Sequence, residues 1–298
     1  MTLPPGYQGP SAPQPDQPQG MPVCVRHPDR PTGLRCVRCD RPACPQCLRE
    51  AAVGYQCVDC VSQGSRTVRQ RTTIAGARVR TQVVVVPVLI VLNLAVYAIT
   101  VAQAGSLGAN DRAPLFDDWV LWPAGMVSFG EPWRLITAGF LHYGPIHVAL
   151  NMVALWILGR DIEPLFGRAR FVAVYLLSLL GGSVAVFLFG PVGGGTAGAS
   201  GAVWGVMGAV LVTVLRLKLN PQPVLAVIAI NAVISFLPGI SLFGHLGGFV
   251  VGAAASAALL YAPRGRQQVP VQAGALVGIA VLLLMLTAMR WAQLAPTF

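Results

Sequence analysis

The stretch GTAGASGAVWGVMG, residues 195–208, places one hydroxyl, that of Ser200, in a run of glycine and alanine. The segment continues without a charged residue as far as Arg216. Its length and composition are typical of a helix that crosses a membrane. Because a hydroxyl in hydrocarbon needs a hydrogen-bonding partner, the rest of the chain has to supply a polar group at the same depth.

The composition excludes an ordinary soluble domain. Of 298 residues 54% are hydrophobic and only 11% are charged, whereas soluble domains carry about a quarter charged residues. Residues 1–82 hold eleven of the 21 Lys and Arg and five of the 11 acids, and the apolar remainder has single charges between neutral runs. The net charge of +10 therefore indicates membrane orientation, and we expect no nucleic-acid partner.

We expect an all-α polytopic membrane protein with a small zinc-binding module in front of it. The expected parts are a disordered Pro/Gln-rich tail that is not a signal peptide (1–22), a double zinc module (23–62), a basic juxtamembrane linker (63–82), a six-helix core (83–261) and an additional transmembrane helix with the C-terminus (262–298). The expected spans are 83–103, 146–163, 170–190, 199–217, 222–238, 242–261 and 269–289.

The loop charges predict the orientation of these spans. Cationic residues precede the first span and occupy every second loop, and the alternate loops are acidic or neutral. By the positive-inside rule the N-terminus is cytoplasmic, and an odd number of spans puts the C-terminus outside. Arginine is used almost to the exclusion of lysine, which indicates a GC-rich genome. We expect a multi-pass protein of a bacterial plasma membrane.

Residues 24–60 contain every cysteine of the chain, arranged in four pairs at a two-residue spacing. The pairs are Cys24 with His27, Cys36 with Cys39, Cys44 with Cys47, and Cys57 with Cys60. Such spacing lets two neighbouring side chains bind one metal, so eight ligands predict two tetrahedral Zn²⁺ sites. A disulfide framework is disfavoured in a reducing cytoplasm, and a catalytic zinc would need an open coordination position. We expect a structural module that contacts another cytoplasmic protein.

The module resembles the B-box type of zinc finger, in which ligand pairs interleave. That resemblance implies that Cys24, His27, Cys44 and Cys47 share one zinc, and that the other is bound by the remaining cysteines Cys36, Cys39, Cys57 and Cys60. Spacing alone also permits sequential pairing.

Four polar side chains fall at one depth in the predicted membrane. His147 and Asn151 stand four residues apart on one helical face near the outer start of the second span. Ser200 and His245 each lie in the first turn of a span that also enters from outside. Singly, each is more often a packing or core residue. Together a nucleophile, a base and hydrogen-bond donors are the parts that acyl transfer requires.

Small residues allow these groups to meet. Glycines repeat on the fourth span (Gly201, Gly205, Gly208) and every four residues on the sixth (Gly244, Gly248, Gly252). Such stripes let two helix backbones approach closely. Trp204 follows Ser200 by one turn on the same face, where it can stack on the imidazole of His245.

From about residue 83 to 261 the chain resembles the rhomboid family of intramembrane serine proteases. The motifs that carry the resemblance are Trp133-Arg134, His142, HVALN at 147–151, GRDIEPLFGRARF at 159–171, GASG at 198–201 and GHLGG at 244–248. The chain departs from the family's pattern at Gly244, where Ala is usual, and at Trp204, where Tyr is frequent. Neither change removes a reacting group.

The resemblance implies a Ser/His dyad of Ser200 and His245, with an oxyanion hole formed by His147, Asn151 and the backbone amide of Ser200. Gly198, Gly201, Trp204, His142, Trp133 and Arg134 are the expected supporting residues. It also implies cleavage of single-span membrane proteins in contact with membrane lipid, near the outer face and beside a small residue. Two alternatives remain: an inactive relative that binds membrane proteins, and a transporter with a histidine proton relay, which would predict ionisable groups throughout the membrane depth.

Overall fold

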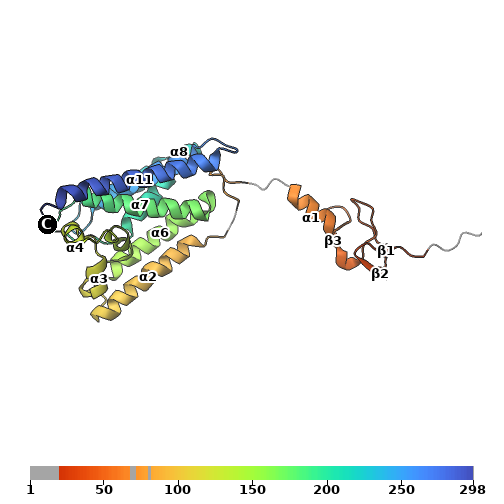
Figure 1. Ribbon diagram of the computed structural model, residues 1–298, viewed down its shortest axis with the longest axis horizontal. Coiled ribbons are helices and arrows are strands. Elements are labelled where there is room, and N and C mark those ends of the chain that lie inside the picture. Colours follow the sequence, from red (N-terminus) through yellow and green to blue (C-terminus); the bar gives the residue numbers. More distant parts are fainter. Residues whose placement is uncertain (1–19, 68–71, 80–81, 298) are drawn as a thin grey trace, which may run out of the picture. The chain divides into compact units, whose positions relative to one another are not determined.

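The computed structural model describes residues 20–67, 72–79 and 82–297, so most of the tail expected at 1–22 lies outside the described residues. The chain divides into two compact units, Met1–Gln70 and Arg71–Phe298, each of which folds on itself. Figure 1 shows small strands and one helix in the first unit and a bundle of long helices in the second.

The N-terminal unit consists of two small antiparallel sheets and a helix. Its elements are β1 (Val23–Cys24), β2 (His27–Pro31), the 3-10 turn η1 (Pro45–Cys47), β3 (Leu48–Glu50), β4 (Tyr55–Cys57) and α1 (Val58–Thr67). Strand β1 pairs with β2, and β3 pairs with β4. The buried cluster consists of the cysteines with little more than Ala43 and Leu48. A unit with so small an apolar core needs further stabilisation. Helix α1 runs beyond the boundary expected at residue 62.

The membrane unit contains one helix at each of the seven expected positions. These helices are α2 (Val85–Ala104), α6 (Gly144–Phe166), α7 (Arg168–Phe189), α8 (Ser200–Arg216), α9 (Gln222–Ile234), α10 (Leu242–Leu260) and α11 (Gln268–Leu294). The connection from α2 to α6 folds into the short elements η2 (Asn110–Arg112), α3 (Pro114–Trp119), α4 (Pro123–Phe129), α5 (Arg134–Thr137) and η3 (Ala138–Phe140). Figure 1 shows α3 and α4 gathered at one end of the bundle.

Length and composition support fewer spans than expected. Among the residues that the structure describes, the four helices α2, α7, α10 and α11 are long and apolar enough to cross a membrane, and a fifth span results if α6 is joined to Arg134–Phe140, to which it is bent by 93°. Helices α8 and α9 have 17 and 13 residues, shorter than a full crossing. The count of seven spans therefore stays a prediction.

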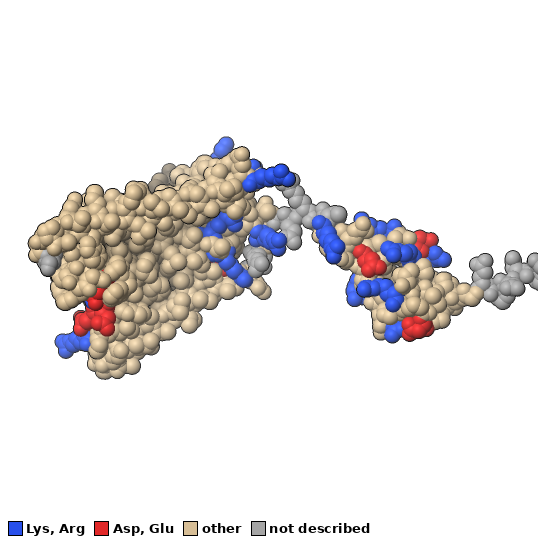
Figure 2. All heavy atoms as spheres, in the orientation of Figure 1, with Lys and Arg blue, Asp and Glu red and all other residues tan. Residues whose placement is uncertain are grey.

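The charges of the membrane unit separate along its length. On the visible face, Lys and Arg gather at the end where segment 72–79 joins the bundle, and Asp and Glu gather at the opposite end, with an uncharged surface between (Figure 2). Such a distribution is typical of a bundle embedded in a bilayer.

The expected approach of α8 and α10 through their glycines is confirmed. A Cβ on Gly248 would lie 2.0 Å from the carbonyl oxygen of Gly201, and one on Gly252 would lie 2.3 Å from that of Gly205. Helix α7 joins the same contact, because a Cβ on Gly182 would lie 2.6 Å from the carbonyl oxygen of Gly244. Three helix backbones thus touch at the level of Ser200 and His245.

We expect Gly248→Ala to lower the free energy of unfolding by about 1–3 kcal/mol, because the added methyl group forces α8 and α10 apart. The measurement is the denaturation midpoint of the purified protein in detergent. Gly274→Ala on α11 is the matched control, since a Cβ there meets nothing within 4 Å. Equal midpoints for the Gly248 and Gly274 variants would contradict the close packing of α8 on α10.

Helix α2 begins on a carboxylate from another helix. Glu163 of α6 accepts backbone hydrogen bonds with Oε1 from Val84 (2.8 Å) and Val85 (3.0 Å), and with Oε2 from Val86 (2.9 Å). The first N–H groups of a helix have no intrahelical acceptor, and a negative charge at this end is favoured by the helix dipole. Glu163 is only 1% exposed, so it fixes the start of α2 against the end of α6.

We expect Glu163→Ala to lower the free energy of unfolding by on the order of 3 kcal/mol, because it leaves buried N–H groups without a charged acceptor. Thermal or denaturant unfolding in detergent measures the loss. Asp161→Ala, two residues away with a side chain that is 76% exposed, is the control and should be close to wild type. If the two variants unfold together, Glu163 does not hold α2.

Part of the segment expected to be a linker packs on the membrane unit. Residues 72–79 form a hairpin in which the N–H of Thr73 donates to the carbonyl of Ala77 at 2.8 Å, and Ala75 is fully buried. The amide of Gln272 on α11 donates to the carbonyls of Ala75 (3.0 Å) and Leu259 (2.7 Å). Its oxygen accepts from Nε of Arg170 at 2.9 Å. This hairpin is therefore a fixed part of the membrane unit.

Candidate active site

Ser200 is the first residue of α8, and backbone hydrogen bonds fix the loop that precedes it. The chain before it pairs with the α2–α6 connection, where Leu121 and Thr196 exchange backbone hydrogen bonds of 3.1 and 2.9 Å and the N–H of Gly198 donates to Ala138 at 2.9 Å. Gly198 has a φ of +134°, which side-chain-bearing residues rarely adopt. At the start of α8, the N–H of Ser200 has no intrahelical acceptor, and the helix dipole favours negative charge.

His142 supports the residue before the serine. Its ring is fully buried, and its Nε2 accepts the N–H of Ala199 at 3.4 Å. The ring also meets that of His147 edge-on, with 5.1 Å between centroids. His142 thus holds the backbone N–H of the residue that precedes Ser200.

His147 presents a hydrogen-bond donor toward the serine. Its Nδ1 accepts the N–H of Tyr143 at 3.2 Å, so the neutral ring carries its proton on Nε2. A Cβ on Gly198 would lie 2.9 Å from that Nε2 and 3.7 Å from Oγ of Ser200, which places both groups beside the same glycine. Asn151, one turn further along α6, is 7% exposed and donates one N–H of its amide to the carbonyl of His147 at 3.0 Å.

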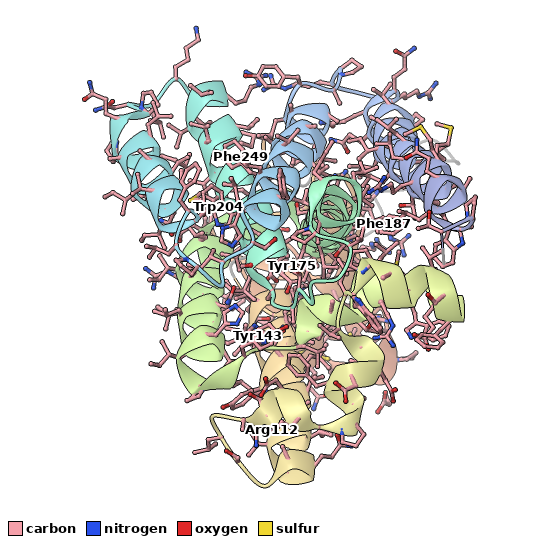
Figure 3. All side chains as sticks on the ribbon, turned by 90° about the vertical axis from the view of Figure 1, so that its left-hand side faces the viewer. Arg112, Tyr143, Tyr175, Phe187, Trp204 and Phe249 are labelled. Carbon is pink, nitrogen blue, oxygen red and sulfur yellow. The ribbon has the colours of Figure 1, made fainter. Side chains whose placement is uncertain are left out.

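His245 lies in the first turn of α10. Ser241 caps this helix by accepting the N–H of Gly244 at 3.2 Å, and its carbonyl accepts the N–H of His245 at 3.1 Å. The predicted stacking on Trp204 is confirmed, with 5.0 Å between ring centroids and an interplanar angle of 20°. Figure 3 shows Trp204 next to Phe249, whose ring meets it edge-on.

Ser200 and His245 are brought together through their neighbours. A Cβ on Gly201 would lie 3.3 Å from the carbonyl oxygen of Gly244, so the residues adjacent to the serine and the histidine are in contact. The hydrogen bonds among the described residues do not include one between Ser200 and His245. In substrate-free enzymes such bonds are often long and shorten when substrate binds.

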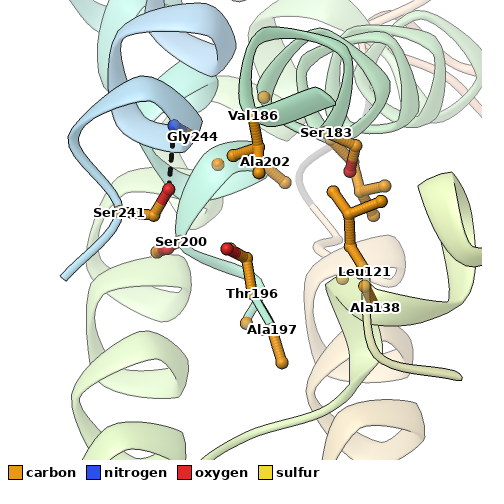
Figure 4. A pocket seen from close by; sticks show the side chains of 15 residues that line it. Leu121, Ala138, Ser183, Val186, Thr196, Ala197, Ser200, Ala202, Ser241 and Gly244 are labelled. Atoms are coloured by element: carbon orange, nitrogen blue, oxygen red, sulfur yellow. Dashed lines mark hydrogen bonds between the residues drawn. The ribbon is translucent and has the colours of Figure 1, made fainter. Parts of the chain in front are cut away.

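A small cavity of about 30 Å³ opens beside Ser200 (Figure 4). Its walls come from α7, α8, the start of α10 and the paired loops, and they include Ser183, Thr196 and Ser241, which sequence reasoning missed. Generic serines and threonines carry no signal in a single sequence. The cavity walls are otherwise mostly Gly, Ala, Val and Leu, so the space fits a small apolar group.

Residues 130–262 match the family model of the Rhomboid domain. We refer to this matched stretch as the Rhomboid domain. The match covers Ser200, His147, Asn151 and His245, whereas α2 and the first part of the loop after it precede the matched range.

Curated relatives are similar to part of the chain. Rhomboid protease GluP from Bacillus subtilis is 39% identical over 140 residues, which cover 45% of this chain and 27% of that protein. RHOMBOID-like protein 6, mitochondrial, from Arabidopsis thaliana is 40% identical over 148 residues, covering 47% of each chain. Rhomboid protease AarA from Providencia stuartii is 25% identical over 207 residues, covering 59% of this chain and 72% of that protein. The chain thus spans about a quarter to a half of the length of the first two relatives.

Within the Rhomboid domain, Arg134 holds the loop that precedes α6. It is 5% exposed and pairs with Glu131 through a 2.6 Å hydrogen bond from Nε, while its NH1 donates to the carbonyls of Asp117 and Val120. Trp133 is 49% exposed and does not line the cavity beside Ser200. Both residues therefore belong to the loop scaffold.

Outside the Rhomboid domain, the N-terminal unit forms two four-ligand clusters. Cys24, His27, Cys44 and Cys47 form one and Cys36, Cys39, Cys57 and Cys60 the other, with the ligand atoms of each cluster within 4.8 Å of one another. The interleaved pairing is confirmed and the sequential pairing is not found. Nδ1 of His27 is the imidazole atom at the first cluster, 3.3 Å from Sγ of Cys47.

The donor set fits a soft divalent cation. A backbone N–H of Cys44 lowers the pKa of the Cys24 thiol to about 6, so one sulfur is readily ionised. Hydrogen bonds to Cys39 and Cys57 raise the pKa of Cys60 to about 12, because four crowded sulfurs cannot all ionise without a balancing charge. Both clusters could hold a metal ion, and four thiolates, or three with an imidazole, are the ligand sets that Zn²⁺ prefers.

Proposed function

We propose that this protein is an intramembrane serine endopeptidase that uses Ser200 as nucleophile and His245 as general base. One observation carries the proposal: a serine at a helix N-terminus lies beside a small cavity, Nε2 of His147 lies at the glycine two residues before that serine, and a histidine stacked on Trp204 follows directly after Gly244, which also lines the cavity. The match to the Rhomboid domain and relatives whose names are rhomboid protease and rhomboid-type serine protease support the same reaction.

In the proposed reaction, Oγ of Ser200 attacks the peptide carbonyl and Nε2 of His245 takes the hydroxyl proton. The carbonyl oxygen becomes an oxyanion, stabilised by the N–H of Ser200, Nε2–H of His147 and the amide of Asn151. His245 then protonates the leaving amine, which departs and leaves an acyl-enzyme on Ser200. His245 then takes a proton from water, which attacks the ester. The proton passes from His245 to Oγ of Ser200 as the acid product leaves, so both residues return to their starting state.

The substrates that we propose are single-span membrane proteins cut beside a small residue. The cavity beside Ser200 has room for little more than a methyl group, which favours alanine or a residue of similar size there. A helical segment does not offer its carbonyl to a nucleophile, because the carbonyl is hydrogen-bonded within the helix. We therefore expect substrates whose helix unwinds easily near the outer face of the membrane.

The proposed setting is a bacterial plasma membrane with the N-terminal unit in the cytoplasm. In that unit the two clusters bind structural Zn²⁺, with Cys24, His27, Cys44 and Cys47 at one ion and Cys36, Cys39, Cys57 and Cys60 at the other. Zinc supplies no step of the peptidase reaction. The folded module binds a cytoplasmic partner or the cytoplasmic tail of a substrate, which raises the local concentration of that substrate.

The test combines covalent labelling with proteolysis. Detergent-solubilised protein is treated with a fluorophosphonate probe, and the labelled residue is identified by peptide mass spectrometry. Cleavage of a single-span reporter with an alanine near its outer end is followed in liposomes. We expect label on Ser200 and one main cut beside the small residue. Label on another serine, or cleavage without Ser200, would overturn the assignment.

A further inference from the structure

His245 has a second buried partner besides Trp204. Its Nδ1 lies 2.7 Å from Oγ of Ser235, the C-cap residue that follows α9. The exposed fractions of His245 and Ser235 are 8% and 2%, so water has little access to this contact. No carboxylate among the described residues forms an ion pair or hydrogen bond with His245.

The direction of this hydrogen bond follows from the other contacts of Ser235. A serine hydroxyl has one proton, and Oγ of Ser235 donates it to the carbonyl of Asn231 at 2.8 Å. With its proton in that bond, the oxygen accepts at its contact with His245, and this arrangement places the proton of the neutral imidazole on Nδ1. The opposite nitrogen, Nε2, then carries a free lone pair.

We propose that Ser235 is a positioning residue that holds His245 in the Nδ1–H tautomer and so keeps Nε2 available to take the proton of Ser200. The proposal rests on the proposed Ser/His dyad. Ser235 occupies the place at which serine proteases with a triad use a carboxylate. It is a neutral acceptor, and so stabilises the imidazolium less than a carboxylate does.

The two histidines of the site then have opposite hydrogen-bonding roles. Tyr143 donates to Nδ1 of His147, which leaves a donor at Nε2, whereas Ser235 accepts from Nδ1 of His245, which leaves an acceptor at Nε2. The ring of His147 can donate a hydrogen bond to an oxyanion, and the ring of His245 can accept the proton of a hydroxyl. His147 and His245 are both titratable, so pH measurements on the site have to include both rings.

The tautomer can be read without catalysis. In protein labelled with ¹⁵N-histidine, the two ring nitrogens of a neutral imidazole have well-separated chemical shifts, and the chain has only four histidines to assign. We expect Nδ1–H for His245 in the wild type and a mixture of tautomers in Ser235→Ala. Loss of one signal set in His245→Gln assigns the resonances. Nε2–H in the wild type, or an unchanged tautomer in Ser235→Ala, overturns the proposal.

Kinetics of Ser200 labelling give the second readout. We expect Ser235→Ala to slow labelling about 10- to 100-fold, the range seen when an orienting hydrogen bond is removed, and Ser235→Thr to restore most of the rate. Ser256→Ala is the control: Ser256 is a fully buried serine on α10 whose hydroxyl has no partner among the described residues, and its loss should leave the rate unchanged.

The pH profile separates orientation from packing. Ser235→Asp places a carboxylate at Nδ1, which favours the imidazolium, so the acidic limb of the labelling rate moves to higher pH. Ser235→Ala moves the limb to lower pH, because a bond that favours the imidazolium is lost. If all Ser235 variants have the labelling rate of the wild type and the same acidic limb in its pH profile, the inference is overturned. If wild-type Ser200 takes no label while the tautomer shifts as expected, the proposed peptidase function fails, whereas the assignment of Ser235 as the residue that fixes the tautomer of His245 stands.

Discussion

Ser200→Ala and His245→Ala are each expected to abolish peptide-bond cleavage, with a loss on the order of 10⁴-fold or more, and the double variant is expected to be no slower than either. The reason is that the nucleophile and the base act as one unit: without His245 the hydroxyl keeps its proton, and without Ser200 the base has no proton to take. The measurement is the cleavage rate of a single-span reporter in liposomes.

Asn151→Ala distinguishes the oxyanion donors from the dyad. Loss of one donor costs on the order of 10²-fold when the others remain, so this variant should retain measurable activity. Trp133→Ala serves as a control outside the cavity and should cleave at nearly the wild-type rate. Additive losses in the Ser200/His245 double variant, or substantial cleavage by Ser200→Ala, would show that another residue is the nucleophile.

Removal of the metal is expected to unfold the N-terminal unit while the Rhomboid domain stays folded. The buried cluster of the N-terminal unit is built almost entirely from the ligand cysteines, and structural Zn²⁺ contributes roughly 10–16 kcal/mol to folding in small modules. We expect two zinc ions per chain by elemental analysis. A chelator should make residues 24–60 sensitive to protease without changing the rate of Ser200 labelling.

Paired substitutions test which ligands share an ion. Cys24→Ser with Cys47→Ser removes two ligands of one interleaved cluster, so one zinc should remain. Cys24→Ser with Cys60→Ser damages both clusters, so both zincs should be lost. Ser62→Ala, on the same helix as Cys60, is the control and should keep both zinc ions. Loss of both zincs from the Cys24/Cys47 variant, or retention of protease resistance without metal, would contradict these assignments.

The sequence predicts the helix positions well because long apolar runs separated by charges leave few alternatives. It also predicts the contact of α8 with α10 and the stacking of Trp204, since both depend on helical spacing alone. The number of complete crossings is not predictable in this way, because α8 begins inside the bundle at Ser200 and its length is set by the loop before it.

Other features depend on contacts between distant segments. Spacing leaves interleaved and sequential metal pairing equally open, and only the folding of β1–β4 decides between them. Ser235 is one serine at the end of a short helix, and nothing local marks it as a partner of His245. The sequence predicts that residues 72–79 belong to a basic linker. The small residues Ala75, Gly76 and Ala77 instead let this segment pack as a hairpin against α11 and Gly167.

The contacts of Gln272 bear on how the protein can be dissected. Its single amide completes the C-terminal end of α10 through Leu259, the hairpin through Ala75 and the side chain of Arg170, at a position only 3% exposed. A chain cut after Tyr261 would leave these three groups unpaired in an apolar setting. We therefore expect that the six helices preceding α11 do not fold as an autonomous core, and that the seventh helix is as much a part of the architecture as the helices that carry Ser200 and His245.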